Sequence, residues 1–211
     1  MTLATEHGFP MYVAWSSIHH GWAVGEQGAP EEGSALFKEA LSLYQAPGIK
    51  GWIPFYLGLL AQLDGQGGRA EEGLSVLAEA RELSTQRGDC WSEAELYRLT
   101  GELTLQKFKA RPEQSRRIQS SEPVLSGVEG INGEEEAEGH FLKAIEIAQK
   151  QEAKSWKLRA ATSLAHLWQQ QGKKQEALDL LAPVYNWFTE GFDTPDLKDA
   201  KALLDELMER Q

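Results

Sequence analysis

The chain has 211 residues, of which 41% are hydrophobic and 25% charged, so it can fold around a core and is too mixed to be disordered. Its formal charge of -11 argues against DNA or RNA as the main partner, because binding to phosphates needs clustered Lys and Arg. The sequence contains neither an apolar run of the roughly 18 residues that a membrane span needs nor a signal peptide, which predicts a cytoplasmic protein with no membrane contact.

Helical segments follow one another along the chain. Residues 2–7 are typical of the end of a helix whose beginning is missing, which predicts that the chain is the last part of a longer repeat array. Four helical hairpins and a charged capping helix follow, and together they predict a single repeat domain over residues 1–211. The predicted ranges are 10–47, 52–88, 91–151 and 155–190 for the hairpins and 195–210 for the cap.

The second helices of the four hairpins share one spacing of small and large residues. A small residue is followed four positions later by a large apolar one, as in Gly33 and Phe37, Gly73 and Leu77, Ala137 and Phe141, and Ala177 and Leu181. The small residues lie 40, 64 and 40 residues apart. The excess of 24 residues predicts one insertion inside the third hairpin.

This spacing has a packing reason. Small residues let two helix backbones approach, and the large residue fills the groove against the next hairpin. A hairpin cannot bury its apolar face alone, so stacked neighbours are needed. We therefore predict an all-α fold, a right-handed superhelical solenoid of antiparallel helix hairpins. Thr194, Pro195 and Asp196 open the last helix with a cap residue, a proline and an acid, and its polar outer surface suits an array terminus.

The pattern of small residues resembles the tetratricopeptide repeat (TPR) over almost the whole chain. The departures are a period of 40 rather than 34 residues and the lack of the repeat's tryptophan and proline. A narrower resemblance lies in GRAEEGLSVLAEA, in EAELYRLTGEL and in the long phrase that begins LRAATSLAHLWQQQGKK. These phrases resemble the carboxy-terminal TPR region of bacterial proteins that join a nucleotide cyclase and an AAA-type ATPase to TPRs. That resemblance implies a regulatory arm, because neither catalytic domain is in this chain.

Residues 109–133 are rich in Ser, Gly, Pro and charge, which predicts a flexible inserted loop. The alternative is a docking loop that places Arg111, Arg116 and Arg117 on an acidic partner.

No catalytic constellation is found. The sequence lacks GxxxxGK[ST], GxSxG and HExxH, the motifs of P-loop NTPases, serine hydrolases and zincins. The single cysteine, Cys90, excludes an internal disulfide and a zinc site built from cysteines. His19 and His20 are adjacent, so on a helix their rings diverge by about 100° and cannot chelate one metal from one face. We expect no enzyme activity, no cofactor and no metal.

The resemblance to TPRs implies that the first helix of each hairpin lines a concave groove, where peptides bind. The candidate groove residues are Trp15, Ile18, Trp22 and Glu26; Phe55, Gln62 and Gln66; Glu95, Arg98, Glu102 and Gln106; and Arg159, Thr162, His166, Gln169 and Gln170. The alternative for Trp15, Trp22 and Phe55 is packing between hairpins, and packing is the interpretation favoured for Trp52, Trp91 and Trp156.

Three hypotheses of function follow. The first is a non-enzymatic interaction module, the carboxy-terminal arm of a bacterial ATPase or adenylate/guanylate cyclase signalling protein. It would bind a peptide or a partner domain, including the catalytic domains of its own polypeptide. The second is a small-molecule sensor whose ligand changes the curvature of the solenoid. The third is self-association through the open first repeat around Leu3.

Overall fold

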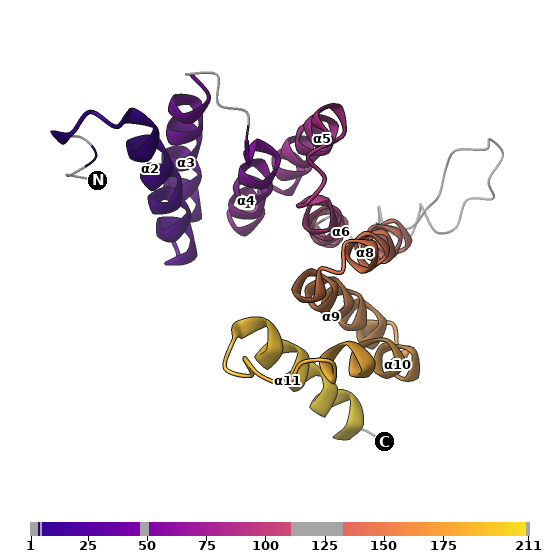
Figure 1. Ribbon diagram of the computed structural model, residues 1–211. Coiled ribbons are helices and arrows are strands. Elements are labelled where there is room, and N and C mark those ends of the chain that lie inside the picture. Colours follow the sequence, from indigo (N-terminus) through magenta and orange to yellow (C-terminus); the bar gives the residue numbers. More distant parts are fainter. Residues whose placement is uncertain (1–3, 5, 47–50, 111–132, 210–211) are drawn as a thin grey trace. The chain divides into compact units, whose positions relative to one another are not determined.

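The computed structural model describes residues 4, 6–46, 51–110 and 133–209, and within these ranges the regular structure is helical, with no β-strand (Figure 1). The predicted all-α class is confirmed. None of the helices in these ranges is long and apolar enough to cross a membrane. The helices are α2 (Pro10–Glu26), α3 (Pro30–Gln45), α4 (Ile53–Gln66), α5 (Ala70–Arg87), α6 (Glu93–Ala110), α8 (Gly133–Lys150), α9 (Lys154–Gln170), α10 (Lys174–Tyr185) and α11 (Pro195–Glu209).

Some predictions fall outside the described residues. Residues 111–132, most of the predicted inserted loop 109–133, lie outside them, while the flanking residues 109, 110 and 133 belong to α6 and α8. Residues 2, 3 and 5 of the predicted leading helix also lie outside, and with them Leu3, on which the predicted self-association depends.

The chain divides into two compact units, Met1–Cys90 and Trp91–Gln211, called here unit 1 and unit 2. In unit 1, α2 packs along α3 and α4 along α5, and α4 also contacts α2 and α3. In unit 2, α6 packs along α8 and α9 along α10, while α9 also contacts α6 and α8. The consecutive helices of each pair run antiparallel (Figure 1). The single domain over 1–211 stays a prediction.

Four three-residue turns join consecutive helices in the same way. In each turn the middle residue has a positive φ, at Gly28, Gly68, Glu152 and Gly172. The N–H of the following residue donates to the carbonyl oxygen five positions earlier in the chain, for example Ala29 to Val24 at 3.3 Å. This bond satisfies a carbonyl that the helix end leaves without an intrahelical partner. Glycine takes the left-handed conformation without strain, so three of the four turns carry the residue best suited to it.

Acidic and proline residues begin several helices. Pro10, Pro30 and Pro195 are the first residues of α2, α3 and α11, where the missing N–H of proline costs no hydrogen bond. Carboxylates in a first turn interact favourably with the positive end of the helix dipole. These first-turn acids are Glu31 and Glu32 in α3, Glu71 and Glu72 in α5, and Glu134, Glu135 and Glu136 in α8.

Glycines allow α2 and α3 to pack backbone against backbone. A Cβ added at Gly33 would lie 2.6 Å from the backbone nitrogen of Gly25 and 2.7 Å from the carbonyl oxygen of Gly21. A Cβ at Gly21 would lie 2.7 Å from the backbone nitrogen of Phe37, a fully buried side chain. In unit 2, a Cβ at Gly101 would lie 2.6 Å from the ring of Phe141. The predicted role of the small residues, close approach of two helices, is confirmed at these positions.

One buried acid connects α3 to α4 in unit 1. The side chain of Asp64 is fully buried, and its Oδ1 accepts hydrogen bonds from Ser34 and from Arg69, both at 2.7 Å. Burial alone would raise the pKa of Asp64, but these two hydrogen bonds and the charges of Lys38 and Arg69 outweigh it, so the pKa lies below its usual value.

The last helix covers the end of unit 2. Leu197, Leu203, Leu204 and Leu207 of α11 are buried in one cluster with residues of α9 and α10, among them the fully buried Leu181. The opposite face of α11 is charged. Within unit 2, α11 therefore has the apolar inner face and polar outer face that the sequence predicts for a cap.

Candidate functional site

A polar cavity of about 500 Å³ opens in unit 2 between α6, α9 and the start of α11. We call it the polar cavity. Its residues lie three or four positions apart on α6 and on α9, so each helix presents one face to it. The lining residues are Arg98, Glu102, Leu105, Gln106 and Lys109 of α6, Phe141 of α8, Arg159, Thr162, Ser163, His166, Leu167 and Gln170 of α9, and Asp196 and Asp199 of α11.

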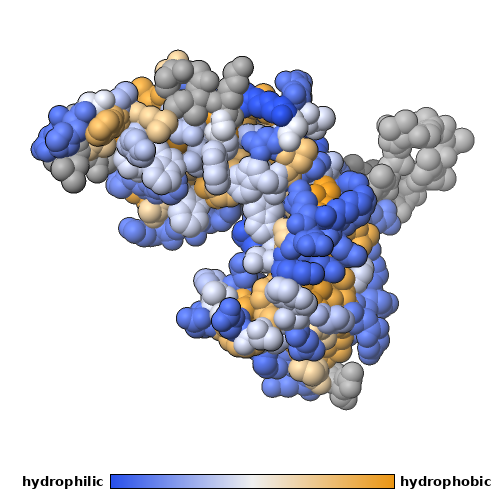
Figure 2. Space-filling view, viewed as in Figure 1, coloured by the Kyte–Doolittle hydropathy of each residue, from blue (hydrophilic) through white to orange (hydrophobic). Residues whose placement is uncertain are grey.

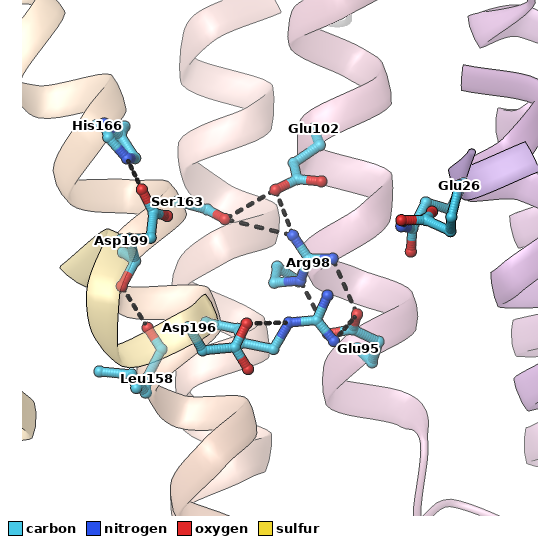
Figure 3. Close-up of polar contacts among 12 residues, drawn as sticks. Glu26, Glu95, Arg98, Glu102, Leu158, Ser163, His166, Asp196 and Asp199 are labelled. Atoms are coloured by element: carbon cyan, nitrogen blue, oxygen red, sulfur yellow. Dashed lines mark hydrogen bonds and ion pairs between the residues drawn. The ribbon is translucent and has the colours of Figure 1, made fainter. Parts of the chain in front are cut away.

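Arg98 is the centre of the polar contacts at this cavity. Its Nε and Nη2 donate to the two carboxylate oxygens of Glu95, at 2.8 and 2.9 Å, and both side chains are buried. Its Nη1 donates to Glu102, whose Oε1 also accepts from Ser163 Oγ at 2.9 Å. Figure 3 shows these side chains pointing toward one another from α6 and α9. A bidentate arginine–carboxylate pair of this kind fixes both the position and the orientation of the Arg98 guanidinium.

Arg159 extends the network from α9 to α11. Its Nη1 lies 2.7 Å from Glu95 Oε1, and its Nε lies 3.7 Å from Asp196 Oδ1. Burial alone would raise the pKa of Glu95, but the charges of Arg98 and Arg159 hold it below its usual value. Burial likewise acts to lower the pKa of Arg98, and its carboxylate neighbours more than reverse that effect. Glu95 therefore stays ionised between two arginines.

The rim of the polar cavity is acidic and partly exposed. The side chains of Glu102, Asp196 and Asp199 are 42%, 47% and 60% exposed. Lys109 donates to Gln170 at 2.8 Å, and His166 Nε2 lies 3.5 Å from Asp199. Glu102 shares Arg98 with Glu95, and Asp196 shares Arg159 with it, while the exposed part of each of the three rim carboxylates faces solvent and can contact a positively charged group that enters from there.

A second cavity, of about 330 Å³, lies in unit 1, and we call it the aromatic cavity. Its walls come from α2, from Tyr44 of α3 and from the start of α4. Side chains of intermediate hydropathy, drawn pale, gather over α2 and α4 in Figure 2. The lining residues are Met11, Tyr12, Trp15, His19, Tyr44, Trp52, Phe55 and Tyr56.

Several ring pairs of the aromatic cavity meet edge to face. The rings of Trp15 and His19 lie 5.1 Å apart at 72°, and those of Tyr44 and Tyr56 lie 5.5 Å apart at 83°. His19 Nδ1 donates to the carbonyl oxygen of Trp15 at 2.9 Å, because a carbonyl can only accept. Edge-to-face contacts are a favourable arrangement for aromatic rings, so the walls support one another.

The structure separates the predicted groove residues into several environments. Arg98, Glu102, Arg159, Thr162 and His166, with Gln106 and Gln170, line the polar cavity. Trp15 and Phe55 line the aromatic cavity. Gln62 and Gln66 both donate to Glu26, at 3.3 and 2.8 Å, and Gln169 donates to Glu206 of α11 at 3.0 Å.

Two predicted residues need correction or comment. Ile18 is fully buried, so the expectation that it lines a binding groove is wrong, because its side chain faces the helices packed beneath α2. Trp22 is half-buried and lines neither cavity, and its indole N–H is buried with no acceptor among the described residues.

The three tryptophans expected to pack between hairpins lie in two different environments. Trp52 is 54% exposed and lines the aromatic cavity. The rings of Trp91 and Trp156 contact each other at 5.7 Å, which agrees with packing.

Several lining residues were missed. Asp196 lies in the first turn of α11, where its sequence signal is that of a helix-start acid, and Asp199 follows in the next turn with no signal of its own. Tyr44 lies on a second helix, outside the positions that the resemblance implies. Ser163 follows the predicted Thr162, and the α9 face shared by residues 159, 163, 166 and 170 was a signal that could have found it.

The polar cavity holds its charged groups in an arrangement that can bind a ligand. Among the described residues, no group of three or more His, Cys, Asp and Glu side chains is placed to hold a metal ion. The polar cavity offers fixed charges and hydrogen-bonding groups on a scaffold of three helices.

Comparison with known proteins gives the fold class. No family model matches the chain, and no curated protein matches it. Among solved structures, it is similar to the nearly identical TPR-like repeats of a Podosopora anserina protein described as a kinesin light chain. The identity is 15% and the TM-score 0.59, over 95% of this chain and 87% of the other. The fold is therefore a TPR-like array of helix hairpins.

Proposed function

We propose that this chain is a non-enzymatic interaction module and that the polar cavity binds a segment of a partner protein. The observation that carries this proposal is the bidentate Arg98–Glu95 pair beneath an open, partly exposed polar surface. Charged groups held in place before binding lose little conformational freedom when a ligand arrives, which favours affinity. Helical scaffolds with such surfaces commonly bind extended or helical peptides through a few anchors.

The charges of the polar cavity favour a basic segment. Counting Glu95, four carboxylates surround it against three basic side chains, Arg98, Lys109 and Arg159, with His166 left aside. Arg98 and Arg159 are already engaged with Glu95, whereas Asp199 is 60% exposed and lies 3.5 Å from His166 Nε2. A Lys or Arg of the partner would contact Asp196, Asp199 or Glu102.

The test selects peptides from a displayed random library on the whole chain and measures their affinities by fluorescence anisotropy. The selected peptides should be enriched in Lys and Arg. Their Kd for the double variant Asp196→Asn, Asp199→Asn should be about tenfold higher, which is a loss of ~1.4 kcal/mol in binding free energy.

The matched control is Glu135→Gln, Glu176→Gln, which likewise removes two carboxylates near the starts of helices of unit 2, at positions that line neither cavity. It should bind like the wild type. Peptides without an excess of basic residues, or equal loss in both variants, would refute the assignment.

We further propose that the module is the carboxy-terminal arm of a bacterial ATPase or cyclase signalling protein, with those domains as partners. The support is the resemblance of GRAEEGLSVLAEA and of the long phrase beginning at Leu158. Reading the coding DNA upstream of Met1 tests this: an open frame that encodes a cyclase or ATPase domain is expected, and an unrelated upstream gene would contradict it.

A further inference from the structure

The aromatic cavity has an unusual lining for an apolar site. Of the eight described residues that line it, six are Trp, Tyr or Phe, and the other two are Met11 and His19. No Leu, Ile or Val lines it within the described part of the chain, although branched aliphatic side chains would serve equally well if the cavity only removed water from a hydrocarbon group. What aromatic rings add is a negative π face, which attracts cations.

The net charge of unit 1 also favours a cation. Among the residues that the structure describes, which leave out 47–50, no Lys or Arg lines the cavity. Unit 1 contains eleven Asp and Glu against five Lys and Arg, a formal charge of -6. A field of this sign raises the local concentration of positively charged ligands.

The backbone at Trp52 is a third, independent observation. Trp52 precedes α4 with φ 66° and ψ 0°, in the left-handed region that a bulky L residue rarely adopts. A glycine would take this conformation without strain, yet the position carries an exposed indole at the cavity. Strained backbone of this kind gathers at binding sites, where the side chain has a task that outweighs the strain.

From these observations we propose that the aromatic cavity binds a quaternary ammonium group, such as the trimethylammonium head of a small ligand. The cavity volume of about 330 Å³ lies at the small end of the roughly 300–1,000 Å³ found for ligand sites, which fits a compact head group with a short chain. The rings of Trp15, Tyr44 and Trp52 supply the cation–π surface. This site is separate from the polar cavity, and its ligand is independent of the partner segment proposed there.

The test compares two probes of nearly the same shape by isothermal titration calorimetry on the whole chain. Choline carries the quaternary ammonium, and 3,3-dimethyl-1-butanol replaces its nitrogen by carbon and has no charge. Choline should bind about tenfold or more tightly than the alcohol. Equal affinities would show an ordinary apolar site, and the absence of saturable choline binding at millimolar concentrations would show no site; either result overturns the proposal.

Variants locate the site. Trp15→Leu keeps an apolar side chain but removes a π face, so it should weaken choline several-fold and leave the alcohol unchanged. Trp187→Leu, at an exposed tryptophan of unit 2 outside both cavities, is the matched control and should leave choline binding intact. If Trp15→Leu loses its helical circular dichroism, Phe55→Leu takes its place. Choline binding that survives loss of the ring would refute the assignment.

Discussion

Replacing Gly33 by alanine tests whether the contact of α2 with α3 depends on the missing side chain. The added Cβ would lie 2.6 Å from the backbone nitrogen of Gly25 and 2.7 Å from both the Cα of Gly25 and the carbonyl oxygen of Gly21. Favourable non-bonded separations between carbon atoms are roughly 3.5–4.0 Å. All three neighbours are backbone atoms, so no side chain can rotate away, and the two helices must separate by about 1 Å at this point.

Two effects of opposite sign set the size of the change. Alanine is a better helix former than glycine by up to about 1 kcal/mol, which would stabilise α3. Overpacking of a close contact costs roughly 1–3 kcal/mol, and a contact between backbones lies at the upper end of that range. The expected result is a net loss of ~2 kcal/mol from the free energy of unfolding. For a unit of this size, that lowers the midpoint of thermal unfolding by about 10 °C.

Urea and thermal unfolding followed by circular dichroism at the helix signal measure this change. The control is Gly139→Ala in α8, where an added Cβ would meet nothing within 4 Å, so only the gain in helix propensity remains. That variant should be as stable as the wild type or more stable by up to ~1 kcal/mol. If Gly33→Ala also matches or exceeds the wild type, close backbone packing does not hold α2 to α3.

Four further outcomes are expected. Arg98→Met should cost ~3–5 kcal/mol in urea unfolding because it leaves Glu95 buried beside a single arginine, whereas adding Glu95→Leu to it should recover most of that loss. Glu152→Gly, at a turn residue with φ 55°, should raise the unfolding midpoint by relieving left-handed strain of about 1 kcal/mol, and a lower midpoint would contradict this. Stability should fall in acid. The folded pKa values of Glu95 and Asp64 lie below their usual 4.5 and 3.8, so the stability from these carboxylates is complete above about pH 5 and is lost as the pH falls through the folded values. Urea midpoints measured from neutral pH downward would show this decline. Trp52→Gly should stay within ~1 kcal/mol of the wild type in stability while choline binds several-fold more weakly by calorimetry.

The sequence predicts the helix pairs well because their packing rule is local. Gly21 and Gly33 occur where two backbones must approach. Close approach requires small residues, and these can be recognised in the sequence because they recur at fixed intervals. The spacing of four positions from Gly33 to Phe37 likewise follows from the helix period. Such requirements can be predicted without knowing how the hairpins are arranged.

The cavities depend on contacts between hairpins, and the residues that make these contacts are not marked by a regular pattern in the sequence. Ile18 occupies a position that the resemblance assigns to the groove, yet the local packing buries it completely. Asp199 faces the polar cavity only because α11 packs on α9, and nothing in its own neighbourhood distinguishes it from an acid near a helix start. Tyr44 enters the aromatic cavity from a second helix, where the repeat pattern predicts no ligand contact.

The shared form of the turns has a consequence for how such a chain can change in length. The turns at Gly28 and Gly68 have the same hydrogen bonds and lie 40 residues apart. Recombination between two such turns would therefore remove or duplicate one whole hairpin in a step of 40 codons. The new junction would be a turn that the chain already uses, so the smallest heritable change in array length that needs no new connection is one hairpin.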